Sequence, residues 1–326
     1  MKRESLCRSI SRRGFLKQAG VAAVAGSLSL VAAETDQKCP VIDTHMHIWS
    51  GDLQKFPFAD SVKKAATPPK TAGTVEVLLK EMNEFGVTHC VLVQALFHGW
   101  DNSYVAHCLR QHPQLFRAQG LIDPTDPRVA DKLEFWMREH HFSGMRFSPI
   151  YYVGKDEWMT SPAHHELWRK ANDLGAIFNF FISTPQLPRL EVMIAKYPGV
   201  RVVIDHLARI DLKQANPLPE FRKLLKLAKY PRVWAKVSEL SLLSPSGKFP
   251  YADTFPWVRR LYDAFGPDRL LWGTGFPGMT RTEHGRPGLR QELDLIEKEI
   301  EFFSASDRRK ILGTNAADLW NFSRKS

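Results

Sequence analysis

Apolar runs alternate with longer amphipathic stretches along the chain after residue 40. Eight short segments predict strands, and most of them read as apolar runs without the in-out alternation of a half-exposed strand, as expected for strands covered on both faces. The predicted strands are 41–48, 88–96, 116–123, 143–149, 176–183, 200–206, 232–238 and 269–274. Apolar residues at helical spacing between and after them predict helices over 75–85, 103–112, 128–140, 163–174, 187–197, 219–228, 255–264, 289–302 and 305–320.

Eight strands, each followed by a helix, predict a (β/α)8 TIM barrel that forms a single domain over residues 34–326. A doubly wound parallel sheet is the alternative, but no Gly-rich phosphate-binding turn follows the first strand. Residues 52–74 carry three prolines and predict a long loop after that strand. Active sites of such barrels lie at the C-terminal ends of the strands, so candidate residues are sought there.

The first 33 residues have the composition of a signal peptide. The basic segment SRRGFLK at 11–17 precedes the uncharged, Gly- and Ala-rich stretch 19–33, which is too short for a comfortable transmembrane helix. The paired arginines followed by Phe and Leu resemble a twin-arginine export signal. This resemblance implies cleavage after Ala33, export of the folded protein to the periplasm and no membrane attachment after cleavage.

The net charge of +10 does not indicate a nucleic-acid-binding protein. Residues 1–33 carry six Lys or Arg and one Glu, so half of the excess lies in the predicted signal peptide. The remainder has no basic stripe interleaved with aromatic residues, which excludes this class of partner. Cys39, Cys90 and Cys108 follow the signal at wide spacing, so no disulfide framework is predicted, and a Cys39–Cys108 bridge stays open.

Histidines stand at the ends of two predicted strands. His45 and His47 lie two residues apart on the first strand and so point to the same side, where both can reach one divalent ion or one substrate carboxylate. His206 ends the sixth strand. Arg146, near the end of the fourth strand, can grip a carboxylate with its guanidinium fork, although an ion pair with an acid inside the rim is the alternative.

Loop residues give weaker candidates for contact with a ligand. They are His98, Trp100, Asn102 and Tyr104 after the second strand, and Glu283 and His284 after the eighth. His164 and His165 fall on a predicted helix and are expected at the surface.

Seven motifs in order resemble the amidohydrolase superfamily, and more narrowly its amidohydrolase-2 branch of lactonases and decarboxylases that act on small carboxylated compounds. The motifs are DTHMHIW, GLIDP, GMRF, VRVVIDHLAR, VWAKVSEL, GPDRLLWGT-x-FP and ILGTNAADLW. The resemblance covers residues 41–319, and it implies a barrel with metal-ligating histidines on strand one and on strand five or six. It also implies an Asp after strand eight, which ligates the metal and acts as general base.

Carried over by position, His45, His47 and His206 match the histidines of that pattern. Two positions depart from it. Asn179 stands on strand five where a His ligand is an option, and we expect it to contact substrate; Gly275 stands in the place of the strand-eight Asp. The resemblance therefore implies a divalent metal, Zn²⁺ first, with a metal-free lactonase as the alternative.

Glu239, just past strand seven, offers a replacement for the missing acid. Relatives more usually have Gly there, so a carboxylate gained on strand seven and lost on strand eight predicts a relocated general base. The alternative is that Glu239 only pairs with a rim Arg or Lys, such as Lys236.

These observations predict an exported hydrolase that cleaves a lactone, ester or amide bond of a small carboxylated molecule. His206 would polarise the carbonyl or help to activate water, Glu239 would serve as base and Arg146 would bind the acidic group. A decarboxylase of the same branch is one alternative, and a non-catalytic binding protein, suggested by Gly275, is the other. The expected partner is a small-molecule substrate, and the sequence leaves homo-oligomer formation open.

Overall fold

The computed structural model describes residues 39–60 and 70–322, so the predicted signal peptide and part of the 52–74 loop lie outside the described residues. Eight parallel strands pair in sequential order within one sheet. They are β1 (Ile42–Met46), β2 (His89–Val93), β3 (Phe116–Gly120), β4 (Gly144–Phe147), β5 (Ile177–Phe180), β6 (Arg201–Ile204), β7 (Val233–Val237) and β8 (Leu270–Trp272). The TIM-barrel prediction is confirmed.

The barrel is closed between its first and last strands. A parallel bridge joins Met46 to Gly275, and the His47 amide donates to the Gly275 carbonyl at 2.7 Å. The buried carboxylate of Asp43 accepts from the amide and the hydroxyl of Thr274, at 3.1 and 2.6 Å. The doubly wound alternative is therefore wrong, because that fold leaves its outer strands apart.

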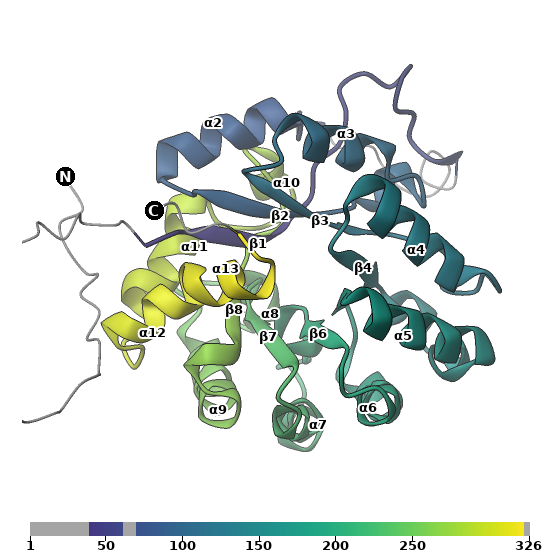
Figure 1. The fold of residues 1–326 in the computed structure, drawn as a ribbon. Coiled ribbons are helices and arrows are strands. Elements are labelled where there is room, and N and C mark those ends of the chain that lie inside the picture. Colours follow the sequence, from purple (N-terminus) through teal and green to yellow (C-terminus); the bar gives the residue numbers. More distant parts are fainter. Residues whose placement is uncertain (1–38, 61–69, 323–326) are drawn as a thin grey trace, which may run out of the picture.

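Helices surround the strands as a ring (Figure 1). Those that follow successive strands are α2 (Val75–Phe85), α3 (Ser103–Gln111), α4 (Val129–His140), α5 (Pro162–Leu174), α6 (Leu187–Lys196), α7 (Leu218–Lys226) and α9 (Phe255–Phe265). Short helices α8 (Leu240–Leu243) and α10 (Thr280–Glu283) lie in the loops after β7 and β8. The chain ends with α11 (Leu289–Asp294), α12 (Ala305–Arg309) and α13 (Asn315–Leu319).

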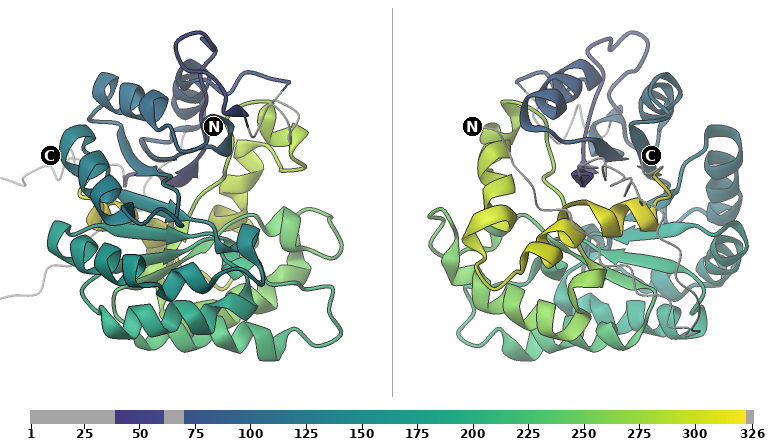
Figure 2. Two further views of the ribbon diagram at one scale, coloured as in Figure 1. Left: turned by 90° about the vertical axis from the view of Figure 1, so that its right-hand side faces the viewer. Right: turned by 60° about the vertical axis from the view of Figure 1, so that its left-hand side comes forward.

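One end of the barrel is closed by the last helix. Apolar side chains from the strand interiors form one cluster with residues of α13 and the segment after it, which lies across the strands (Figure 2). The cluster comprises Ile42, Val91, Ile177, Val203, Leu271, Ala316, Ala317, Leu319, Trp320 and Phe322. Since this packing fills the end where the strands begin, side chains at the opposite end are left to form a site.

Several boundaries and residues differ from the sequence predictions. Each strand ends one to three residues before its predicted end, because the chain leaves the sheet to form the loops of the mouth. The predicted helix 289–302 ends in a π-helical turn at Leu295–Glu299, and the predicted helix 305–320 is interrupted by one at Lys310–Thr314.

The structure decides one open alternative and contradicts one expectation. Cys108 is a free, buried thiol, so the Cys39–Cys108 bridge does not form. His164 is buried, with Nε2 2.9 Å from the Pro124 carbonyl, because it faces the core side of α5 and not solvent. In the described part of the chain, no helix has the length and apolar character needed to cross a membrane.

Candidate active site

The two histidines of β1 meet at the mouth of the barrel. His45 Nε2 and His47 Nε2 lie 3.1 Å apart, and His47 Nδ1 lies 2.8 Å from the Val93 carbonyl. Burial, followed by nearby charges, lowers the pKa of His45 well below its usual value and that of His47 to about 3. Both imidazoles are therefore neutral near pH 7, the form in which a histidine can ligate a metal or accept a proton.

A buried lysine fixes the orientation of His45. Lys236 Nζ lies 2.8 Å from the Thr44 carbonyl and 3.0 Å from both His45 Nδ1 and Asp205 Oδ1. An ammonium has only donors, so His45 Nδ1 accepts and its Nε2 carries the proton that His47 receives. Burial alone would raise the pKa of Asp205, but the adjacent charges, Lys236 first, lower it, so this carboxylate stays ionised.

His206 and Glu239 form the second half of the site. His206 Nε2 lies 3.3 Å from Glu239 Oε1, and His206 Nδ1 lies 2.8 Å from Ser238 Oγ. Burial lowers the pKa of His206 well below its usual value. The neutral imidazole of His206 can accept a hydrogen bond at Nδ1 from Ser238 Oγ, while its Nε2 faces the Glu239 carboxylate in a close polar contact.

The backbone that presents these two residues is unusual. All four residues from 206 to 209 have a positive φ, between 47° and 51°, and Glu239 has a φ of +56°. Non-glycine residues rarely adopt this left-handed conformation, and such strain concentrates at functional sites. The turn places His206 and Arg209 on the same side as Glu239, whose Oε2 accepts from Arg209 Nη1 at 2.9 Å.

Glu239 also contacts an arginine from the loop after β8. Arg286 Nη2 donates to Glu239 Oε1, and Arg286 Nη1 donates to the Thr274 carbonyl at 3.2 Å. Glu239 therefore does pair with arginines of the rim, as the alternative interpretation expected. Lys236, which that interpretation named as a partner, pairs with Asp205 instead. Whether Glu239 also acts as a base stays a prediction.

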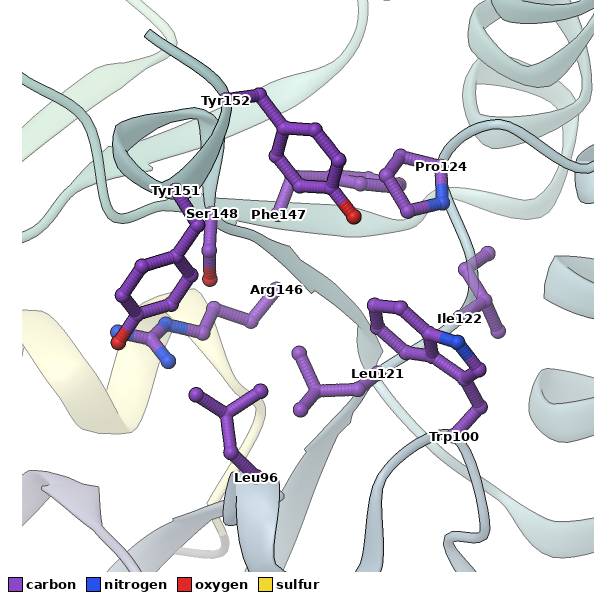
Figure 3. A pocket seen from close by; sticks show the side chains of 10 residues that line it. All are labelled: Leu96, Trp100, Leu121, Ile122, Pro124, Arg146, Phe147, Ser148, Tyr151 and Tyr152. Atoms are coloured by element: carbon purple, nitrogen blue, oxygen red, sulfur yellow. The ribbon is translucent and has the colours of Figure 1, made fainter. Parts of the chain in front are cut away.

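Arg146 connects the histidine cluster with a cavity of about 160 Å³ (Figure 3). Its Nε lies 3.5 Å from Asp205 Oδ2, and its guanidinium stacks on Phe181 at 4.6 Å. Apart from Arg146 and Ser148, the cavity is lined by Leu96, Trp100, Leu121, Ile122, Pro124, Phe147, Tyr151 and Tyr152. The alternative in which Arg146 pairs with an acid inside the rim is therefore confirmed, and the binding of a substrate carboxylate by Arg146 stays a prediction.

The remaining candidates divide between the cavity and the structure around it. Trp100 lines the cavity and is 44% exposed. His98 is buried away from it, between the Pro57 carbonyl and the Ser50 amide at 3.1 and 3.3 Å, and so anchors a loop. Asn179 is fully buried beside Arg146 in the β4–β5 register, and its side-chain amide has no hydrogen-bond partner among the described residues.

The loop candidates after β8 pack near the site without entering it. His284 stacks on Phe276 at 4.2 Å, and Phe276 in turn lies 5.3 Å from His47. Glu283 accepts from the Lys70 amide at 3.3 Å.

Sequence reasoning missed Asp205 and Arg286 and gave Lys236 the wrong partner. Asp205 directly precedes His206 at the end of a strand, and that position was a usable signal. Arg286 lies in an irregular loop 11 residues after Gly275, and no periodic pattern points to it.

The donor set fits a divalent cation in its chemistry. His45, Asp205 and His206 each offer one ligand atom, and these atoms lie within 4.8 Å of one another. Imidazole nitrogens with a carboxylate oxygen are typical ligands of Zn²⁺. Lys236 and Arg146 also contact the Asp205 carboxylate, and their positive charges oppose a further cation there.

Comparison with known proteins agrees with this fold. The family described as Amidohydrolase matches residues 42–322, and the chain belongs to this family. It is 27% identical over 284 residues to the 4-sulfomuconolactone hydrolase of Hydrogenophaga intermedia, covering 85% of this chain and 88% of that protein. It is also 27% identical to the 2-pyrone-4,6-dicarboxylate hydrolase of Comamonas testosteroni, over 74% of this chain and 78% of the relative.

Among solved structures, an amidohydrolase from Burkholderia multivorans with bound Zn has a TM-score of 0.68 and 20% identity. The match covers 87% of this chain and all of that one, and at this identity it shows the shared fold alone. Family membership and hydrolase relatives together identify the chain as a hydrolase-class enzyme.

Proposed function

We propose that the chain hydrolyses the ester bond of a small lactone that carries a carboxylate. The observation that supports this most is the position of Arg146, whose side chain reaches both the ring-sized cavity and the Asp205 end of the histidine cluster. A carboxylate bound by Arg146 would place the rest of a small substrate between the cavity and the histidines.

The cavity indicates what the substrate carries besides its carboxylate. Its volume of about 160 Å³ is close to that of the apolar cavity of about 150 Å³ that accepts one benzene molecule. Its walls are mainly aliphatic and aromatic, and Ser148 Oγ is a buried hydroxyl without a hydrogen-bond partner among the described residues. We therefore propose a substrate with one apolar or unsaturated ring, in preference to a polyhydroxylated sugar lactone.

In the proposed reaction, Glu239 takes a proton from water while the water oxygen forms a bond to the lactone carbonyl carbon. The tetrahedral intermediate collapses, the ring C–O bond breaks, and the proton held by Glu239 passes to the alkoxide, leaving a hydroxy acid. His206 Nε2 lies against Oε1 of this carboxylate and helps to keep the carboxylate in place. A divalent metal, for which we propose Zn²⁺, would be held by His45, His47, Asp205 and His206 in place of the contacts that these side chains make with one another and with Lys236, and when bound it would polarise the carbonyl.

The decisive experiment uses the chain without residues 1–33 and follows acid release from a panel of ring-bearing and sugar lactones. We expect turnover of carboxylated ring lactones, a loss of about 10² to 10⁴ in kcat for Glu239→Gln and no loss for Glu301→Gln, an exposed control.

Metal content by elemental mass spectrometry, and turnover after chelation, test the metal. CO₂ release without acid release from a lactone would identify the decarboxylase alternative, and binding without turnover would identify a binding protein.

We also propose that the protein is exported to the periplasm, because residues 1–33 have the features of a twin-arginine signal. Replacement of Arg12 and Arg13 by lysine should retain the chain in the cytoplasm of a bacterial host. Unchanged fractionation of that variant would contradict this route.

A further inference from the structure

Gly275 leaves a space that an arginine fills. A Cβ atom at this position would lie 1.6 Å from Arg286 Nη1 and 2.8 Å from Arg286 Cζ. The φ of +121° at Gly275 also disfavours any residue with a side chain. The guanidinium of Arg286 therefore occupies the volume where a side chain at position 275 would begin.

From this space Arg286 holds one particular oxygen of Glu239. Its Nη2 donates to Glu239 Oε1, the oxygen that faces His206 Nε2, while Arg209 binds the other oxygen, Oε2. Arg286 is 9% exposed and stacks on the Phe276 ring at 4.7 Å, whereas the Arg209 side chain is 26% exposed. The more buried of the two arginines is thus the one that contacts the oxygen next to His206.

We propose that Arg286 is a positioning residue, admitted by the missing side chain of Gly275, that holds Glu239 Oε1 against His206. The inference rests on the proposed function only in that it concerns the same carboxylate. It requires that Arg286 and Gly275 act as one unit, so that a methyl group at 275 and the loss of Arg286 have the same effect on His206.

The first test needs no substrate. In the chain without residues 1–33, the ¹⁵N imidazole spectrum reports the contact between His206 Nε2 and the Glu239 carboxylate, with the resonance assigned by its loss in His206→Gln. We expect Arg286→Ala, Gly275→Ala and Glu239→Gln to shift this resonance in the same direction. Gly266→Ala is the control, because Gly266 also has positive φ (+70°) but has no atom within 4 Å of an added Cβ. An unchanged His206 resonance in Arg286→Ala would overturn the proposal.

A double variant separates displacement of Arg286 from backbone strain at Gly275. If the methyl group acts by displacing the guanidinium, Gly275→Ala combined with Arg286→Ala shifts the His206 resonance no further than Arg286→Ala alone. If strain is the cause, the two shifts add, and the coupling that we propose is absent. Arg286→Lys, which keeps a buried cation but loses the planar fork, serves if Arg286→Ala does not fold, and it should shift the same resonance.

Kinetics provide the second test, with a lactone from the substrate panel. We expect Arg286→Ala to lower kcat about 100-fold, as misplacement of a reacting group does, with KM nearly unchanged. Guanidinium ion at non-denaturing concentration should restore part of kcat in Arg286→Ala, but not in the double variant, whose methyl group fills the space. If kcat fell and KM rose by similar factors in Arg286→Ala, and guanidinium ion restored neither, a positioning role for Arg286 would be contradicted. A wild-type chain that hydrolyses no lactone would count against the proposed function, while the spectra would still decide this inference.

Discussion

At the scale of single residues, the most demanding group in the site is Lys236. Its ammonium is fully buried, and burial lowers its pKa despite the carboxylate beside it. All three of its donors have acceptors, in Thr44, His45 and Asp205. A buried charge is tolerated only when it is paired and hydrogen-bonded in this way, so the lysine and Asp205 depend on one another.

We therefore expect Lys236→Met to lower the free energy of unfolding by about 3–5 kcal/mol, because it leaves the Asp205 carboxylate buried without its main partner. The control is Lys223→Met, since Lys223 forms a partly exposed pair with Glu220 on α7 that is worth about 0–1 kcal/mol. Urea titration of both variants makes the measurement. A loss for Lys236→Met no greater than for the control would show that Asp205 finds compensation elsewhere.

At the scale of elements, the turn after β6 determines the geometry of the site. Residues 206–209 form a left-handed turn, with Leu207 and Ala208 near φ +50° and ψ +34°. This conformation costs about 1–2 kcal/mol for each residue with a side chain. Since Leu207 and Ala208 are also completely buried, their packing helps to hold the turn in place.

Two buried alanines test this strain. Ala171 lies inside α5 and, like Ala208, is completely buried. We expect Ala171→Gly to cost about 1.5–2 kcal/mol, from the lost methyl burial and the greater freedom of unfolded glycine. Ala208→Gly loses the same contributions but relieves about 1–2 kcal/mol of strain, so its net cost should be close to zero. Equal costs in chemical denaturation would mean that the left-handed turn is not strained.

The elements could largely be predicted from the sequence, because their pattern is set by which faces are buried. Helix Val75–Phe85 agrees with its prediction at both ends, and all eight strands were found. The left-handed turn at 206–209 and the π-helical turns could not be predicted, since they depend on packing between segments far apart in the chain. At the site, the histidines at the strand ends could be predicted from the sequence. The placement of Arg286 in the space at Gly275 could not, because it depends on the conformation of an irregular loop.

At the scale of the whole molecule, buried charges extend from the site to the outer helices. Glu292, on α11, is 2% exposed, and burial raises its pKa to about 8, against a partial opposing effect of Arg281 and Arg286. Arg281 is itself 1% exposed and pairs with Glu81 of α2 at 3.1 Å. The end of the chain is thus connected to its beginning through groups whose charge depends on pH.

The pKa of Glu292 makes stability depend on pH in a definite direction. In the unfolded chain Glu292 loses its proton near pH 4.5, whereas in the folded protein it keeps the proton until about pH 8. The unfolded state therefore binds fewer protons than the folded state across this interval. The contribution of Glu292 to stability is complete below about pH 4.5 and is lost as pH rises through about 8. Glu292→Gln stays neutral throughout, so we expect its melting temperature to gain on wild type as pH rises over that range, while Glu301→Gln, at an exposed position, keeps a constant difference. A constant difference for Glu292→Gln as well would mean that Arg281 and Arg286 keep the carboxylate charged, and that the connection between the site and α11 is an ion pair.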